Sequence, residues 1–251
     1  MRVLVSRGNL FGICQKTMLL ALVLTISACA NAPRVSGIND PFESGNRKVH
    51  ALNKTLDRTI LKPLSGAYGT VSIGPISKVV SNFSSNMSLP GAMVNDILQL
   101  NMTDFFANTF RFAMNTTVGI GGIFDVATQN GLQEHATDFG ETLHVWGVPE
   151  GRFLELPVYS ASTERDAVGI IVDWAIDPMN YLLPSNLIYV GTTSHMLNSL
   201  GRRDQFSDFV ESVLYESDDS YSLSRLLYLQ SRRKHLNGEL TDDDLEDPYA
   251  E

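Results

Sequence analysis

The sequence predicts a mainly α-helical fold, and two observations lead to this class. Apolar residues recur at three- and four-residue spacing through most of the chain, as in Val49, Leu52, Leu56 and Ile60, which is the spacing of one helix face. Signals for strands are few and short. The clearest is the segment 154–159, which contains Pro157 and is therefore expected to be extended rather than helical.

The first expected helix has a well-marked beginning. Asp40 suits the N-cap, Pro41 suits the first helical position, and Glu43 completes a pattern like a capping box. Because the residue before a proline disfavours helical geometry, this helix is expected to run from about 41 to 61 and to end before Pro63.

Prolines, glycines and capping residues also divide the rest of the chain. Gly74-Pro75 opens a helix, Ser88 with Pro90 is expected to restart the chain, and Asp177-Pro178 is expected to end a helix. A polar, turn-rich stretch from Asn130 to Gly151 predicts a loop or hairpin. The expected helices cover about 75–87, 92–100, 103–118, 163–176, 186–200, 203–216 and 220–236, with Ser162 or Thr163 capping the one at 163–176.

The helix expected at 103–118 has an unusual pattern. Phe105, Phe106, Phe110 and Phe112 surround one charged residue, Arg111, so the apolar residues spread around most of the helix rather than forming one stripe. Two interpretations follow: a central core helix, or a helix that contacts protein on one side and acyl chains on the other.

Cys29 closes the run Ile26-Ser27-Ala28-Cys29, which has the form of a bacterial lipobox. Basic residues precede a short apolar segment at 17–26, as in a secretion signal. About ten apolar residues are too few to cross a bilayer, which needs about 20. We therefore expect residues 1–28 to be removed and Cys29 to become the acylated first residue of the mature protein.

The residue after Cys29 is Ala30, where an aspartate would favour retention at the inner membrane, so we expect an outer-membrane location on the periplasmic side. The other cysteine, Cys14, lies in the signal, so the mature chain is expected to have neither a disulfide nor a cysteine-based metal site.

The mature chain has 251 − 28 = 223 residues and, without the three basic residues of the signal, a net charge of 16 − 28 = −12. An acidic chain without a basic stripe is a poor candidate for binding nucleic acid. We expect a tether at 29–39, one helical domain at 40–237, and a disordered acidic tail at 238–251.

No motif gives positive support for catalysis, and no cofactor or metal is expected. There is no G-x-S-x-G elbow, and Ser231 and Lys234 fit S-x-x-K only as a string. Phe124 stands where a dinucleotide loop would need glycine. His135 and His144 lie in an acidic segment that could gather a metal, but surface solvation is the simpler interpretation.

Several ordered runs resemble the VacJ/MlaA family of outer-membrane lipoproteins. They include Asp40-Pro41-Phe42-Glu43 with Asn46-Arg47, Phe110-Arg111-Phe112 with Asn115, Gly119 to Ala127, Asp138 to Leu143, Trp146-Gly147-Val148, and Arg165-Asp166. The resemblance covers about 39–190. The sequence departs from the family at Ser44-Gly45 and Ser160-Ala161, which leaves local detail there open.

This resemblance implies a ring of amphipathic helices in the membrane interface, around an amphipathic channel. It also implies a trimeric porin partner, and passage of mislocalised phospholipid from the outer leaflet to a periplasmic carrier protein. By the same resemblance, the loop at about 130–147 would help to gate the channel. The residues expected to serve the channel or its gating are Gly119, Gly121, Gly122, Phe124, Asp138, Gly140, Trp146 and Gly147.

A second set of matching residues is expected to hold the fold together: Asp40, Pro41, Glu43, Asn46, Arg47, Arg111, Asn115, Asp125, Arg165 and Asp166. Since a buried unpaired arginine is costly, Arg47 and Arg111 are expected to pair with carboxylates such as Asp57 or Asp125. Binding of a lipid head group by either arginine is the alternative.

The sequence is therefore compatible with three classes of function. The first is a non-catalytic phospholipid transport protein, the second a structural or porin-docking lipoprotein, and the third a lipid-modifying enzyme of the same envelope. A serine, histidine and aspartate set in a cleft would favour the enzyme.

Overall fold

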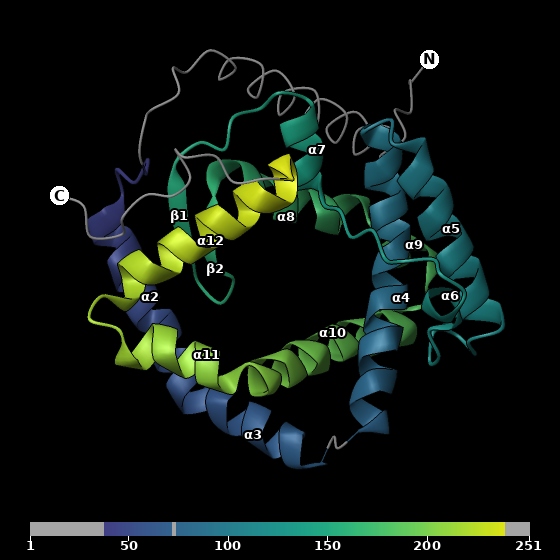
Figure 1. Cartoon of the computed structure of the whole chain (residues 1–251), viewed down its shortest axis with the longest axis horizontal. Helices are drawn as coiled ribbons and strands as arrows, with labels where there is room; N and C mark the ends of the chain where they lie inside the picture. The colour runs from purple at the N-terminus through teal and green to yellow at the C-terminus, as the bar shows by residue number, and fades with distance from the viewer. Residues whose placement is uncertain (1–37, 72–73, 239–251) are drawn as a thin grey trace, which may run out of the picture.

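The computed structural model describes residues 38–71 and 74–238, and its helices follow one another around a ring (Figure 1). The expected signal peptide, Cys29, most of the tether and the acidic tail beyond Gly238 lie outside these residues. Within them, no helix is both long enough and apolar enough to cross a membrane. The mainly α class and the ring are confirmed.

The first half of the ring consists of α2 (Glu43–Leu56), a π-helical turn η1 (Asp57–Leu61), α3 (Lys62–Val71), α4 (Pro75–Leu98) and α5 (Met102–Thr117). Short helices α6 (Val126–Gln129) and α7 (Phe139–Val145) then lead to strands β1 (Phe153–Leu156) and β2 (Ser160–Thr163). The second half comprises α8 (Glu164–Ile176), α9 (Met179–Leu182), α10 (Ser185–Gln205), α11 (Ser207–Glu211), a second π-helical turn η2 (Ser212–Glu216) and α12 (Ser220–Asn237).

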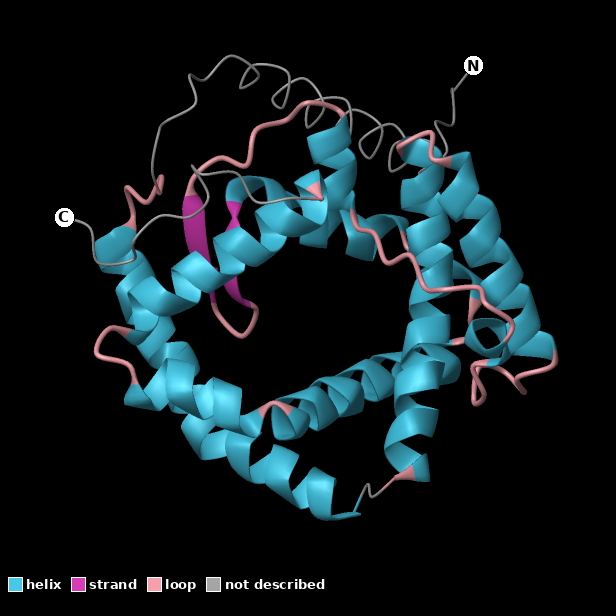
Figure 2. Ribbon diagram, in the orientation of Figure 1, coloured by secondary structure: helices cyan, strands magenta, loops and turns pink. Residues whose placement is uncertain are grey.

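The two strands form an antiparallel hairpin beside α12 in the wall of the ring, and the hairpin turn points toward the opening (Figure 2). Phe153 pairs with Thr163, and Leu156 pairs with Ser160, so Pro157 falls in the turn rather than in the ladder. The extended expectation for 154–159 is confirmed in β1. The side chain of Thr163 accepts a hydrogen bond from the Asp166 N–H and so caps α8, as one of the two expected capping residues.

The expected end of the first helix before Pro63 is wrong, because η1 carries the chain through to α3. The Lys62 N–H bonds to the Asp57 carbonyl, five residues back, which is a π-type bond. In a π-helical turn each backbone N–H bonds to the carbonyl five residues back instead of four. Pro63, the second residue of α3, follows this turn directly, so it does not remove a hydrogen bond from a regular α-helix.

The expected restart at Ser88 and Pro90 is also wrong, because α4 is one helix with Pro90 inside it. Leu89 and Pro90 are both buried, and α4 packs along α5 and α10. Packing along the whole helix outweighs the bond that the proline removes.

The expected loop from Asn130 to Gly151 is wrong over α7. Asp138 caps this helix by accepting from the Glu141 N–H, and Phe139 and Leu143 are buried beneath it. A seven-residue helix with an internal glycine leaves too few periodic positions to be distinguished from a turn-rich loop.

The helices expected near the C-terminus are confirmed in α10, α11 with η2, and α12. Gly238 ends α12 in a left-handed conformation with φ of 78°, which glycine adopts without steric cost. An apolar cluster of Phe153, Tyr221 and Leu229 joins the hairpin to α12.

Candidate functional site

The distribution of polarity in the ring is inverted relative to an ordinary water-soluble domain. Among the described residues, buried polar side chains outnumber buried apolar ones. On α5, for example, Asn108, Arg111 and Asn115 are buried, whereas Phe106 and Phe110 are 55 % and 60 % exposed. The core-helix interpretation of this segment is therefore wrong, since α5 buries its polar side.

Large apolar side chains are exposed along much of the chain. We call the following residues the exposed apolar set: Phe106, Phe110, Val118, Ile120, Phe124, Ile171, Trp174, Tyr181, Leu182, Tyr189 and Val190. Apolar exposure on this scale indicates a surface that contacts something other than water.

The buried face of α5 meets a tight, hydrogen-bonded turn at Gly119 to Phe124. A Cβ at Gly119 would lie 2.2 Å from the Phe124 carbonyl oxygen, and one at Gly122 would lie 2.5 Å from Asn86 Cβ. Gly121 and Gly122 have φ of 69° and 91°, a region that favours glycine. These three glycines therefore allow the chain to turn tightly here, and their expected role in the channel or its gating stays a prediction.

Arg111 joins α5 to the segment after this turn. It is 2 % exposed and lies 3.3 Å from a carboxylate oxygen of Asp125. It also donates to the Thr128 hydroxyl at 2.9 Å and to the Leu132 carbonyl, and Asn115 donates to Asp125 at 3.0 Å. The expected pairing of Arg111 with Asp125 is confirmed.

Asp125 is held ionised by these neighbours. Burial pushes its pKa up, but the hydrogen bonds from Thr128 and Asn115 and the charge of Arg111 outweigh burial and lower the pKa. The side chain also caps α6 by accepting from the Thr128 N–H. One carboxylate thus fixes α5, α6 and the start of the following loop together.

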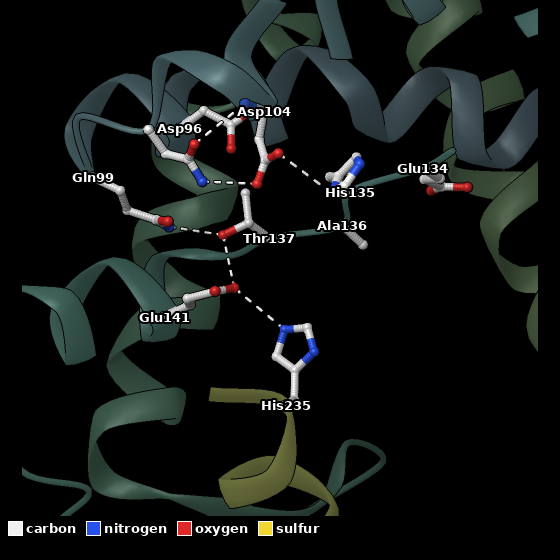
Figure 3. Close-up of a pocket in the computed structure, with 10 residues that line it drawn as sticks. Asp96, Gln99, Asp104, Glu134, His135, Ala136, Thr137, Glu141 and His235 are labelled. Atoms are coloured by element: carbon white, nitrogen blue, oxygen red, sulfur yellow. Dashed lines mark hydrogen bonds and ion pairs between the residues drawn. The ribbon is translucent and has the colours of Figure 1, made fainter. Parts of the chain in front are cut away.

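Residues 130–138 cross from α6 to α7 beside a polar pocket of about 260 Å³ (Figure 3). Asn108 donates to Asp96 at 2.8 Å and to the His135 carbonyl at 2.9 Å. Gln99 donates to the Thr137 hydroxyl at 2.7 Å. The pocket is lined by Asp96, Gln99, Asn101, Asp104, Glu134, His135, Ala136, Thr137, Glu141 and His235.

The pocket carries several carboxylates, and two histidines stand beside them. His135 lies 3.4 Å from Asp104, and His235 lies 3.3 Å from Glu141. Burial raises the pKa of Asp96 to about 6. No three of its histidine and acidic residues form a group suited to a metal ion within the described parts of the chain.

The other candidate gating residues cluster around α7. Arg232 of α12 bridges Asp138, at 2.6 Å, and Asp166, at 3.1 Å. A Cβ at Gly140 would lie 2.5 Å from a carboxylate oxygen of Asp166. The structure therefore brings Asp138, Gly140 and Asp166 together, and Arg165 joins them at 3.4 Å from Asp166.

Trp146 and Gly147 end α7. The indole N–H of Trp146 donates to the Leu98 carbonyl at 3.0 Å, although 52 % of the side chain surface is exposed. Gly147 has φ of 83°, so this turn also favours glycine. These two residues lie at the junction between α4 and α7, apart from the turn at Gly119.

The N-terminal motif forms a clasp with α12, not the expected helix cap. Asp40 accepts from Asn46 at 2.9 Å, from Arg225 at 2.5 Å and from the Tyr221 hydroxyl. The N-cap of α2 is Phe42, which makes no side-chain capping bond. The capping expectation for Asp40 and Pro41 is wrong because Asp40 is committed to partners on α12 and in α2.

The expected pairing of Arg47 with Asp57 is wrong as well. Arg47 lies 2.7 Å from Glu43 and 2.8 Å from Asp219, while Asp57 accepts from Arg203 at 3.0 Å. The hydrogen bond from Arg47 lowers the pKa of Asp219 well below its usual range. Nothing in the local sequence pairs Arg47 with a residue this far along the chain, so sequence reasoning missed Asp219, Arg203 and Arg232.

One serine and histidine pair bears on the enzyme alternative. Ser84 lies 2.7 Å from His195 Nδ1, next to an apolar cavity of about 380 Å³ between α4 and α10. Ser84 is only 1 % exposed, and burial lowers the pKa of His195. Within residues 38–71 and 74–238, no carboxylate is hydrogen-bonded to His195, so the pair lacks the third group of a hydrolytic triad.

The ring, its buried amide and charge network, and its exposed apolar set define a helical protein built for contact with apolar surroundings. The family model for the MlaA lipoprotein matches residues 38–235. The chain therefore belongs to the MlaA lipoprotein family.

Relatives and a solved structure agree with this assignment. The chain is 30 % identical over 223 residues to the intermembrane phospholipid transport system lipoprotein MlaA of Escherichia coli, covering 87 % of each chain. It is 32 % identical to the protein of the same name from Haemophilus influenzae, covering 64 % of this chain and 67 % of the relative.

An uncharacterised protein of Rickettsia typhi is 42 % identical over 145 residues, 57 % of this chain, and the chain spans 58 % of the length of that relative. A chain from a structure described as "Structural basis for maintenance of bacterial outer membrane lipid asymmetry" superposes with a TM-score of 0.68 at 30 % identity. The match covers 79 % of this chain and 99 % of that one.

Proposed function

We propose that this protein is the lipid-anchored outer-membrane component of a phospholipid transport system. It removes mislocalised phospholipid from the outer leaflet along an amphipathic path and passes it to a periplasmic carrier protein, with a trimeric porin as its partner in the membrane. The observation that carries this proposal is the inverted polarity of the ring, in a family whose named relatives are phospholipid transport lipoproteins.

The exposed apolar set supports a position within a lipid leaflet. Apolar surface that would be costly in water is at no disadvantage beside acyl chains. Amphipathic helices without a spanning segment lie in the plane of a membrane interface. Acylation of Cys29 would hold the ring at that depth from the periplasmic side.

The buried polar network supports passage of a head group rather than chemistry on it. A phospholipid that leaves the bilayer needs hydrogen-bonding groups for its head and apolar contacts for its tails. The pocket beside residues 130–138 offers hydroxyl, amide and carboxylate groups, and the cavity beside Phe83 offers apolar walls. No step of such transport requires a nucleophile.

The turn at Gly119 to Phe124 and the loop at 130–138 are suited to gate this path. The turn fixes one end of the loop through Arg111 and Asp125, and α7 fixes the other end through Asp138 and Arg232. Motion of the loop would alter access to the polar pocket without unfolding either end.

The test measures outer-leaflet phospholipid in cells that lack the protein. Deletion is expected to raise surface phospholipid. Wild type is expected to restore the normal level, and Cys29→Ala and Gly122→Val are not. Gly45→Ala is the matched glycine control, because its added Cβ meets nothing within 4 Å.

Each outcome separates the alternatives. Unchanged surface phospholipid on deletion would contradict the transport function. Loss of porin association without any change in surface lipid would favour a docking lipoprotein. Release of fatty acids by the purified protein, abolished by Ser84→Ala, would favour a lipid hydrolase.

A further inference from the structure

Three cations converge on one aromatic ring where the two π-helical turns meet. The Lys54 ammonium lies 5.4 Å, the Arg58 guanidinium 4.9 Å and the Lys62 ammonium 5.6 Å from the centroid of the Tyr215 ring. Arg58 belongs to η1 and Tyr215 to η2. In Figure 1 this meeting point lies where α11 passes alongside α3, which the ion pair between Lys62 and Glu211 confirms.

The hydroxyl group of Tyr215 fixes the position of its aromatic ring. Its hydroxyl donates to Asp57 at 2.8 Å, and Asp57 also accepts from Arg203 at 2.9 Å. Burial, followed by the Asp57 contact, raises the pKa of Tyr215 to about 12. The ring therefore stays neutral, and its face remains available to cations.

Carboxylates do not balance the charge of this cluster. Lys54, Arg58, Lys62 and Arg203 supply four positive charges against two negative charges from Asp57 and Glu211, so the net charge is 4 − 2 = +2. In the described parts of the chain, neither Lys54 nor Arg58 forms an ion pair. The whole chain has a net charge of −9, so this positive cluster contrasts sharply with its surroundings.

Three like charges around one ring repel one another, and an anion placed among them would relieve that repulsion. Guanidinium and ammonium groups donate charge-assisted hydrogen bonds to phosphate oxygens. The same stretch of helix exposes Ile60, Leu61 and Leu64, so apolar surface adjoins the cations. That combination fits a ligand with a phosphate and an acyl tail.

We propose that Lys54, Arg58 and Lys62, gathered around Tyr215, form a binding site for the phosphate of a phospholipid. This inference rests on the proposed function and deepens it, because it names the part of the lipid that this side of the ring recognises. The shared chemistry is a phosphate oxygen, which a free phosphate ion also offers.

The test uses the full-length acylated protein in non-ionic detergent and counts bound lipid by native mass spectrometry. The probes are dioleoyl phosphatidylglycerol, dioleoylglycerol without a phosphate, and inorganic phosphate as competitor. The variant is Lys54→Gln with Arg58→Gln. The control is Lys48→Gln with Lys78→Gln, which removes the same charge from two exposed lysines away from Tyr215.

Each basic group near a lipid phosphate contributes about 1 kcal/mol, or about fivefold in affinity, so the double variant is expected to bind phosphatidylglycerol roughly 25-fold more weakly. The control pair is expected to bind like wild type. Exchanging the cations, Lys54→Arg with Arg58→Lys, is expected to retain most of the affinity, which guards against misfolding of the glutamine variant.

Equal weakening by the control pair, or equal binding of dioleoylglycerol, would overturn the inference. Displacement of the lipid by equimolar inorganic phosphate would assign the site to free phosphate and would overturn it too. Lipid that binds through these groups in a protein that leaves surface phospholipid unchanged in cells would support the site and refute the transport function. Unaltered binding by the glutamine variant, with normal transport, would refute the site alone.

Discussion

Two sides of the ring are stabilised by different physical means. Around the hairpin and α12, Phe153, Tyr221 and Leu229 form an apolar cluster with aromatic edge contacts, as in an ordinary globular domain. Around α4 and α5, the buried groups are amides, hydroxyls and charges, such as Asn95 and Asn108, while phenylalanines are exposed. The first side combines this apolar cluster with ion pairs of α12, such as Arg232 with Asp138, whereas hydrogen bonds between polar side chains dominate the second.

This difference shows which side of the ring can pass from water to acyl chains at a small cost in free energy. A hydrogen-bond network loses little when water outside is replaced by acyl chains, because its partners are internal. The same network has little tolerance for the loss of any one member, since each remaining partner would be left buried and unsatisfied. The α4 and α5 side is thus suited to a lipid leaflet and is sensitive to single polar substitutions.

The largest loss of stability is expected from a substitution in the apolar cluster. Phe153→Ala removes a side chain that is 1 % exposed and is expected to lower the free energy of unfolding by about 4 kcal/mol. Phe106→Ala, at a side chain 55 % exposed, is the control and is expected to change it by well under 1 kcal/mol. Denaturant unfolding of both variants in detergent measures the difference, and equal losses would refute the contrast between the two sides.

The next largest loss of stability is expected from a substitution in the polar network of α5. Arg111→Met leaves Asp125 without its buried cation and is expected to cost about 3 kcal/mol. The double variant with Asp125→Asn is expected to recover part of this loss, because the unpaired charge is removed as well. A double-mutant cycle from unfolding curves gives the coupling between the two residues. Additive losses would show that the pair does not hold the turn.

A smaller effect separates the glycines of the turn. Gly122→Ala combines a positive φ with a Cβ 2.5 Å from Asn86 Cβ, and we expect a loss of about 2 kcal/mol. Gly121→Ala has the positive φ but open space around the Cβ, so a loss of about 1 kcal/mol is expected. Thermal unfolding should show a larger loss of stability for Gly122→Ala than for Gly121→Ala. Gly66→Ala, in open space within α3, is the control and is expected to raise stability by up to about 1 kcal/mol, because alanine is the better helix former. The reverse order would contradict the packing of the turn against α4.

The last effect, which is spread over several pH units, is a pH dependence of opposite sign on the two sides. The raised pKa of Asp96, about 6, means that the folded state holds this proton more tightly than the unfolded state. Its contribution to stability is complete below the ordinary pKa of 3.8 and is lost as pH rises through 6. The lowered pKa of Asp219 acts in reverse, with a contribution present above 3.8 and lost at lower pH.

Unfolding curves of wild type and Asp96→Asn between pH 4 and 7 isolate the first contribution. The difference in stability is expected to shift in favour of the asparagine variant as the pH rises. Asp219→Asn, measured over the same range, is expected to stay below wild type by a constant amount. A constant difference for Asp96→Asn would show that this carboxyl does not titrate in the pocket.

Much of the fold could be predicted from the sequence because amphipathic spacing is a local signal. The helices α8, α10, α11 with η2, and α12 follow from residues that are neighbours in the chain, whereas the short helix α9 was not expected. Asp125 was one of two carboxylates expected to pair with Arg111. The continuity of α4 through Pro90 could not be predicted, since it depends on packing against α5 and α10. The capping role of Asp138 was hidden because α7 spans only seven residues.

The candidate site was less accessible to sequence reasoning, for a physical reason. Asp138 and Asp166 meet through Arg232, which lies far along the chain. The sequence predicts a local helix cap at Asp40, but its partners Tyr221 and Arg225 are on the last helix. Ion pairs between distant segments leave no periodic signal. The family resemblance supplied the residues, and only the structure supplied their partners.

The ion pairs between the two ends of the described chain make closure of the ring depend on its last helix. Asp40 meets Arg225, and Arg47 meets Asp219, so without α12 these links would be missing and the ring would be an open arc. An open arc would leave Phe153 without its apolar partners Tyr221 and Leu229 on α12, and exposed apolar surface promotes aggregation. The last helix is therefore the segment that closes the ring, and its removal would affect the first helix as well as the hairpin.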